Sequence, residues 1–287
     1  RVENRGLKPH VLPERYLPHS DRFREMRIKT VKDLRELILI FPLPSTTRYY
    51  RSRPLNMLGF LVGHEGRGSL LSLLKQEGLA TGLSAGGGDF TSAYSSFEIK
   101  IQLTPKGLKR RKKVIQRVFQ YIRMLRGKSL PRSVYEEVRR MAEIDYRFDE
   151  KIEGTRLVNM FSLLMQIYPL RGVENDPFLI TEYRPRLFDS MLFRLIPGNM
   201  LALVAARDVK TDQTEPIYGT EYSFNNRSTE LLRKWKNLKL HPKLALPKPN
   251  PFLPESLEVV EFRGKVRLTY QSLVGLRREA LDEDFKK

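Results

Sequence analysis

The sequence predicts an α+β fold, a two-layer sandwich in which a mostly antiparallel sheet has helices packed on one face. Three observations predict it: strand patterns come in adjacent pairs near the start, helical patterns then follow in a run, and a strand pattern returns near residue 200. Adjacent strands favour antiparallel pairing, and a run of helices favours a layer that covers one face of the sheet. The 287 residues are 40% hydrophobic and 10% aromatic, a composition that suits a globular core.

The strand segments are recognised by alternation of apolar and polar residues or by short apolar runs. They cover residues 26–30, 34–42, 79–85, 95–103 and 200–206. We expect Pro42 and Pro44 to stop the second strand, because proline cannot donate a ladder hydrogen bond. The triple glycine at 86–88 is predicted to be a turn, and the odd-numbered residues of 95–103 to face the core. Residues 207–226 are predicted to be an extended loop with a weak strand.

The helical segments carry apolar residues at helical spacing or begin at capping residues. They cover residues 55–63, 70–77, 105–126, 131–147, 155–168, 185–194 and 229–235. Ser69 is predicted to cap the second helix, and Gly78 to supply the left-handed residue that ends it. Thr104 followed by Pro105 predicts the start of the long third helix.

Composition along the chain divides it into four parts. Residues 1–24, rich in Pro, Arg and His, are predicted to be an N-terminal arm, and residues 25–238 to be the main domain. The region 239–260 is a proline-rich linker, with prolines at 242, 247, 249, 251 and 254. Residues 261–287 form a divergent charged tail.

The formal net charge of +19 favours an anionic partner, or it reflects basic residues that solvate helix faces. The run Lys109 to Lys113 is the best candidate for a nucleic-acid patch, but its place on an amphipathic helix favours a solvated face. No apolar run reaches the roughly 18 residues that span a bilayer, so we expect no membrane partner. The chain starts at Arg1 without a signal-like segment and has no cysteines, which favours a cytoplasmic location and excludes disulfides.

Catalytic motifs are missing from the sequence. Its histidines are His10, His19, His64 and His241. No pair has the HExxH or HxxEH spacing of a helix-borne zinc site, and no GxSxG elbow occurs. The chain therefore holds no self-sufficient active site, and we predict no cofactor in it.

The glycine-rich run 58–88, LGFLVGHEGRGSLLSLLKQEGLATGLSAGGG, is the most informative segment. So many glycines indicate that main chain approaches another group closely. A strand beside such a bend offers backbone groups to which an extended peptide can pair, and Glu65 can attract a peptide's positive N-terminus. Alternatively, Glu65 bridges locally and the glycines only permit tight packing. His64 is predicted to be a structural hydrogen-bonding residue.

This run resembles the second, non-catalytic domain of the insulysin and pitrilysin family of inverted-zincin (HxxEH) zinc metallopeptidases. Further segments resemble the same domain in the same order: VKDLRELILIFPLPSTTRYYRSRP before it, LTPKGLKRRKKVIQRVFQYIRMLR after it, then TDQTEPIYGTEY and LALPKPNPFLPESLEVV. The resemblance covers about residues 25–260. It implies the metallohydrolase fold shared by LuxS and mitochondrial processing peptidase.

The resemblance also implies a function. Such a domain forms part of the wall of a peptide-enclosing chamber, while zinc and its HxxEH helix belong to the parent enzyme's first domain. It implies a substrate-binding exosite at Gly63, Glu65, Leu83 and Ala85, with Ala85 where insulysins have glycine and Phe60 where they have histidine. The expected partners are peptide substrates and other domains of the same peptidase or a catalytic homologue. The chain alone is predicted to be inactive.

Two alternative functions belong to other classes of protein. In the first, the chain is a catalytically dead scaffold or binding protein of the same fold; the segment after Val260 and the high charge motivate this alternative. In the second, it is a basic nucleic-acid-binding protein that uses the helix at 105–126.

Overall fold

The structure, a computed structural model, describes residues 5–6, 17, 23–89, 91–226, 229–254 and 256–258. Most of the predicted arm, residues 1–24, and all of the predicted tail, residues 261–287, lie outside this range. The chain divides into two compact units, Arg1–Leu253 and Pro254–Lys287. Every helix and strand in the described residues belongs to the first unit.

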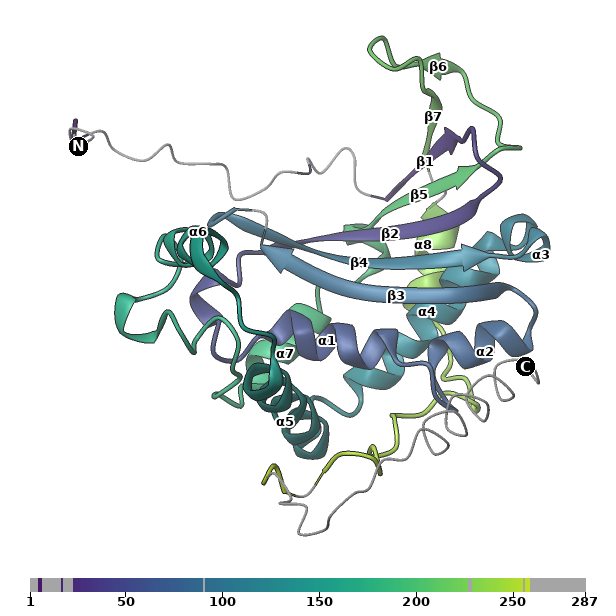
Figure 1. The fold of residues 1–287 in the computed structure, drawn as a ribbon. Helices are drawn as coiled ribbons and strands as arrows, with labels where there is room; N and C mark the ends of the chain where they lie inside the picture. The colour runs from purple at the N-terminus through teal and green to yellow at the C-terminus, as the bar shows by residue number, and fades with distance from the viewer. Residues whose placement is uncertain are drawn as a thin grey trace, which may run out of the picture. The chain divides into compact units, whose positions relative to one another are not determined.

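Seven strands form one sheet in the order β3-β4-β2-β5-β1-β7-β6 (Figure 1). Their bounds are β1 (Arg24–Lys29), β2 (Arg35–Pro44), β3 (Ala80–Asp89), β4 (Tyr94–Leu103), β5 (Leu201–Ala206), β6 (Gln213–Thr214) and β7 (Glu221–Asn226). Strands β1 and β5 pair in parallel, and all other neighbours pair antiparallel. The mostly antiparallel sheet of the prediction is confirmed.

The helices of the described chain follow the predicted order. Their bounds are α1 (Pro54–Gly63), α2 (Leu70–Gln76), α3 (Pro105–Lys109), α4 (Arg111–Arg126), α5 (Arg132–Phe148), α6 (Gly154–Leu164), α7 (Pro185–Leu192) and α8 (Thr229–Lys236). Figure 1 shows α1, α2 and α4 on one side of the sheet, next to β3 and β4. The prediction of an α+β fold with helices on one face is therefore confirmed.

The core lies between the central strands and these helices. Its strand side chains are fully buried: Leu37, Leu39, Phe41, Phe97, Ile99 and Ile101. Helix α4 contributes Ile115, Val118 and Ile122 to the same cluster. The odd-numbered residues of β4 face this core, as the alternation predicts.

Strand β2 continues through Pro42 and Pro44, so the predicted stop is wrong. Its pairing with β4 runs to Pro44, whereas its pairing with β5 ends at Ile40. The Pro42 carbonyl accepts a hydrogen bond of 3.0 Å from the side chain of Asn199, just before β5. The main-chain groups of Pro42 therefore point to the side where β5 has ended, and the missing N–H breaks no ladder bond.

Strand β3 runs through the triple glycine to Asp89, so the predicted turn at 86–88 is also wrong. A Cβ on Gly87 would come within 2.8 Å of the Ser96 oxygen and 2.9 Å of the Leu55 side chain. Gly86 and Gly88 have no atom within 4 Å of such a Cβ. Glycine is needed at Gly87 because helix α1 and strand β4 approach there, and not because the chain reverses.

The predicted helix 105–126 is broken at Arg110, whose φ of −105° and ψ of 27° are not helical. A Cβ on Gly107 would lie 1.8 Å from the Leu79 oxygen, so α3 packs directly on the chain entering β3. The Thr104 hydroxyl accepts from the Gly107 N–H at 2.9 Å and donates to the Gly78 carbonyl at 2.7 Å. These contacts fix α3, and the break lets α4 take its own direction. The region 207–226 also differs from prediction, because it forms the β6–β7 hairpin.

Candidate functional site

The glycine-rich run places a bend between two buried helices. Helix α1 ends at Gly63, and α2 begins after Ser69, whose hydroxyl accepts from the Ser72 N–H at 3.0 Å. Gly68 has a φ of +89° and Gly78 a φ of +66°, values that L side chains rarely adopt. The predicted cap at Ser69 and left-handed residue at Gly78 are confirmed. We call residues 64–68 the Gly bend.

Among the described residues, strand β3 lies at the end of the sheet and has β4 as its one neighbour. A Cβ on Gly59 would lie 3.1 Å from the Ala85 oxygen, and one on Gly63 would lie 3.5 Å from the Ala85 nitrogen. The missing side chains of Gly59 and Gly63 therefore let α1 pack closely on β3 at Ala85. Main-chain groups two residues apart in an antiparallel strand point to the same side, so those of Leu83 and Ala85 point alike.

A hollow of about 470 Å³ opens where this edge meets α1. It is lined by Gly59, Phe60, Gly63, His64, Leu83, Ser84 and Ala85. We call it the α1–β3 hollow. Three of the residues predicted for an exosite, Gly63, Leu83 and Ala85, come together in it.

Glu65, the fourth predicted residue, does not line the α1–β3 hollow. Its side chain is 66% exposed, and its carboxylate lies 4.0 Å from the ammonium of Lys75 on α2. This pair corresponds to the alternative role of Glu65, a local bridge, that the sequence also predicts. An exposed pair at this distance is weak, so the Glu65 carboxylate stays accessible to a cation near the rim of the hollow. Its role in binding remains a prediction.

The hollow also contains Gly59, His64 and Ser84, which the sequence did not assign to the exosite, and Phe60, which the resemblance set opposite an insulysin histidine. Gly59 and Phe60 precede Gly63 and His64 by four residues each, so both pairs lie on one face of α1. This spacing was the available signal. The rings of Phe60 and His64 lie 6.4 Å apart. The His64 ring packs against Gly66, where a Cβ would lie 2.6 Å from Nε2, and its hydrogen-bonding role remains a prediction.

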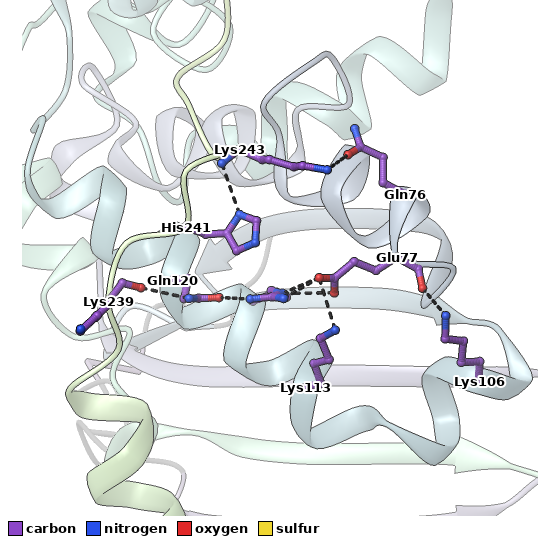
Figure 2. A network of polar contacts seen from close by, with 9 residues as sticks. Gln76, Glu77, Lys106, Lys113, Gln120, Lys239, His241 and Lys243 are labelled. Carbon is purple, nitrogen blue, oxygen red and sulfur yellow. Dashed lines mark hydrogen bonds and ion pairs between the residues drawn. The ribbon is translucent and has the colours of Figure 1, made fainter.

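A polar network lies at the other end of α2 (Figure 2). The Glu77 carboxylate accepts from Arg117 Nε at 3.1 Å and pairs with Lys113 at 3.4 Å. Burial raises the pKa of Glu77, but the hydrogen bonds and charges of Arg117 and Lys113 outweigh it and hold the pKa below its usual value. Arg117 also donates to Gln120 at 2.8 Å, and Gln120 donates to the Lys239 carbonyl at 3.0 Å. The network thus joins α2 and α4 to the start of the predicted linker.

His241 belongs to the same region. Its Nδ1 accepts from the Lys243 N–H at 3.3 Å. Burial, together with the positive charge of Arg117, lowers the pKa of His241, which keeps the ring neutral at pH 7.

The basic run 109–113 is partly used inside the molecule. Arg111 pairs with the buried Glu25 at 2.8 Å, and Lys113 pairs with Glu77 at 3.4 Å. Lys109, Arg110 and Lys112 remain exposed. Two of the five cations in the predicted nucleic-acid patch therefore neutralise acids of the fold.

The donor set does not fit a resident zinc ion. In the described residues no three His, Asp or Glu side chains gather as a metal site. His10 and His19 lie outside the described range. None of the helices in the part of the chain that the structure covers combines the length and apolarity that crossing a bilayer requires.

Two family models match the chain in succession. The model described as "Peptidase M16 inactive domain" matches residues 1–141, and that described as "Middle or third domain of peptidase_M16" matches residues 146–274. The boundary between them falls inside α5. The second match extends into the segment 261–287, and the four-part division of the chain remains a prediction.

Relatives of known name resemble most of the chain. Insulin-degrading enzyme of Bos taurus is 33% identical over 275 residues, which are 95% of this chain and 27% of that protein. Nardilysin of Homo sapiens is 31% identical over 82% of this chain and 21% of its own length. The crystal structure of pitrilysin shares the fold, with a TM-score of 0.83 at 20% identity over 93% of this chain. The chain spans about a quarter of the length of these relatives.

Proposed function

Because the chain belongs to the M16 peptidase family and matches its inactive domain, we propose that it is the non-catalytic, substrate-holding part of an insulysin-like zinc endopeptidase. Its surface forms part of the chamber wall, and the α1–β3 hollow is an exosite for the N-terminal end of a peptide. The observation that carries the proposal is that β3, at the end of the described sheet, and the last turn of α1 line one hollow in which Gly63, Leu83 and Ala85 come together.

An edge strand recognises peptides by backbone pairing, which tolerates many sequences. Leu83 and Ala85 offer two N–H and two C=O groups in the spacing of an added strand. Gly59 and Gly63 add no side chain to the lining of the hollow, which leaves its space open to an extended main chain. The hollow therefore suits the extended end of a peptide better than a folded surface.

Charge supports an N-terminal end. Glu65 stands just outside the hollow with most of its carboxylate exposed. A peptide ammonium at the rim would compete with Lys75, which is 4.0 Å away, for this carboxylate. The Ala85 carbonyl is a second acceptor for the same ammonium.

Two residues make this hollow more apolar than the insulysin pattern implies. Ala85 adds a methyl group at the edge, and Phe60 supplies a ring on the lining. We therefore infer that affinity here depends on backbone pairing and on an apolar first residue of the peptide, with less polar anchoring from side chains.

Cleavage is assigned to a zinc site outside this chain, since the described residues do not fit a metal. The contribution of this chain to catalysis is then positional: a peptide held at its N-terminus reaches the metal with a limited set of bonds in register.

Filling the hollow tests the proposal. The Gly63→Val substitution in the whole polypeptide adds a Cβ that would make an ordinary contact of 3.5 Å with the Ala85 nitrogen, and two methyl groups that take up space in the hollow. We expect the affinity for a fluorescent ten-residue peptide with a free N-terminus to fall about tenfold, which is roughly 1.4 kcal/mol. The N-acetylated peptide should bind the unmodified protein more weakly than the free one.

The matched control is Gly86→Val, which puts the same side chain on β3 where a Cβ meets nothing within 4 Å. It should bind the free peptide as the unmodified protein does. Equal affinities of Gly63→Val and Gly86→Val for that peptide would contradict the exosite.

A further inference from the structure

The first residues of the predicted linker are packed onto the domain body. We call residues 238–246 the strap. Leu238 and Leu244 are each only 7% exposed and belong to the hydrophobic core cluster, and Leu246 packs against that cluster. The Ala245 N–H donates to the Gly68 carbonyl at 3.0 Å. The strap therefore contacts the Gly bend directly.

Polar contacts fix the start of the strap independently (Figure 2). Gln120 of α4, itself 7% exposed, donates to the Lys239 carbonyl at 3.0 Å. Lys243 donates to the side-chain oxygen of Gln76 on α2 at 3.2 Å. A buried amide that depends on a strap carbonyl indicates a defined position, because the amide would otherwise lose its partner.

A continuous series of close contacts leads from the strap to the α1–β3 hollow. A Cβ on Gly68 would lie 3.1 Å from the Ala245 Cβ, so the two chains touch. Two residues earlier, Gly66 lies under the His64 ring. His64 in turn lines the hollow beside Phe60. A displacement of the strap at Ala245 is therefore expected to reach the Gly bend and the His64 ring.

We propose that the strap is a positioning element for the exosite, and that Leu244 and Ala245 are its positioning residues. They hold the Gly bend so that His64 stays on the wall of the hollow and Gly63 leaves the β3 edge accessible. This inference rests on the proposed function of the hollow. It adds that a linker segment, 170 or more residues away in sequence from the bend, sets the affinity for the peptide.

Because the strap is part of the linker, a displacement of the linker is expected to reach the hollow. The strap continues into Pro247, Pro249 and Pro251, a stiff segment that transmits displacement along its length. Moving the linker away from the body would break the Ala245–Gly68 hydrogen bond first, since only main-chain atoms hold it. Peptide affinity would then change without any change in the residues that touch the peptide.

The test is Ala245→Pro in the whole polypeptide, which removes the N–H that Gly68 accepts. Its matched control is Lys248→Pro, in the same linker, where no hydrogen bond from the N–H to a described residue exists. Hydrogen exchange is followed over residues 63–70 and over α5 as a distant reference, and affinity is measured with the free and the N-acetylated peptide.

We expect Ala245→Pro to raise exchange in 63–70 but not in α5, and to weaken binding of the free peptide by about five- to tenfold, a loss that corresponds to roughly 1 kcal/mol. Binding of the acetylated peptide should change less, which a purely structural role would not predict. Lys248→Pro should leave the exchange over residues 63–70 and the affinity for both peptides unchanged. Leu244→Ala keeps the backbone hydrogen bond but removes a buried side chain, and it should change exchange and affinity in the same direction as Ala245→Pro. It replaces Ala245→Pro in the test if the proline variant does not fold.

Faster exchange in 63–70 with unchanged affinity for the free peptide, while Gly63→Val still weakens it, would overturn the inference and leave the proposed function standing. Unchanged affinity in both Gly63→Val and Ala245→Pro would overturn the proposed function, and the inference with it.

Discussion

Glu77 connects three segments of the chain through its carboxylate and its main-chain carbonyl. It follows α2, pairs with Lys113 and Arg117 of α4, and its carbonyl accepts from Lys106 of α3 at 2.7 Å. Its side chain is 18% exposed, so these interactions are only partly screened by water. A single residue at the end of a short helix thus fixes where two other helices begin.

The pH dependence of stability follows from the lowered pKa of Glu77. A carboxyl whose folded pKa lies below its unfolded value stabilises the fold above the unfolded pKa, and this contribution is lost as the pH falls through the folded pKa. We expect Glu77→Gln to lower the free energy of unfolding in urea by about 1–2 kcal/mol at pH 7. The difference from the unmodified protein should shrink below about pH 4, where the unfolded-state carboxyl protonates.

Glu65→Gln is the control for this measurement, because its carboxylate is exposed and 4.0 Å from Lys75. It should leave the free energy of unfolding unchanged at both pH values. A Glu77→Gln effect that persists undiminished at pH 3 would show that packing, and not charge, explains the loss.

Individual site residues were predictable to the extent that regular structure places them. The family resemblance pointed to Gly63, Leu83 and Ala85; Gly63 ends a helix and the other two lie in a strand, so regular structure fixes their place once the two elements pack together. Glu65 and His64 lie in the Gly bend, where no repeat fixes the direction of a side chain. This is why the sequence could not tell that the His64 ring lines the hollow and that Glu65 stays outside it.

Elements were predictable wherever a periodic pattern decides between structures. The alternation in β4 and the apolar stripe of α4 predict the strand and the helix that are observed, because burial on one face imposes the period. The failures occurred at residues whose local preference is overridden by a neighbouring element. Pro42 stays in a strand because β5 has ended beside it, and the break at Arg110 follows α3 packing on Leu79.

The triple glycine gives a test at this scale, because its three positions differ only in their surroundings. Gly87→Ala places a Cβ 2.8 Å from the Ser96 oxygen and 2.9 Å from the Leu55 side chain, so α1 or β4 must shift. We expect it to lower the free energy of unfolding by about 1–3 kcal/mol. Gly86→Ala meets nothing within 4 Å and should be neutral or stabilise by up to about 1 kcal/mol, through the smaller entropy of the unfolded chain.

Urea unfolding of the two variants measures the contrast, and Gly88→Ala, equally open, repeats the control. If all three alanine variants lost the same stability, the glycines would serve the strand's backbone in general, and the close approach of α1 at Gly87 would not be the reason for them.

At the scale of the whole molecule, the fold accounts for part of the basic charge. The net charge is +19, but acids of the body pair with Arg111, Lys113 and Arg117. The sequence could indicate this excess but not which cations are paired, because pairing joins residues such as Glu25 and Arg111 from distant segments. The strap was hidden for the same reason, since irregular chain carries no period.

The inactivity of the isolated chain is the last expectation, and it follows from the way the family divides its work among domains. The described residues contain no group of metal ligands, and the chain spans about a quarter of its relatives. We therefore expect the 287-residue chain, checked by circular dichroism to be folded, to show no cleavage of a quenched fluorescent peptide when zinc is added. The whole polypeptide should cleave that peptide and lose the activity when a chelator removes zinc. Chelator-sensitive cleavage by the 287 residues alone would refute this division of roles. A whole polypeptide that binds the peptide whose N-terminus is free, but does not cleave it, would instead identify a catalytically dead scaffold in which the α1–β3 hollow still binds peptides.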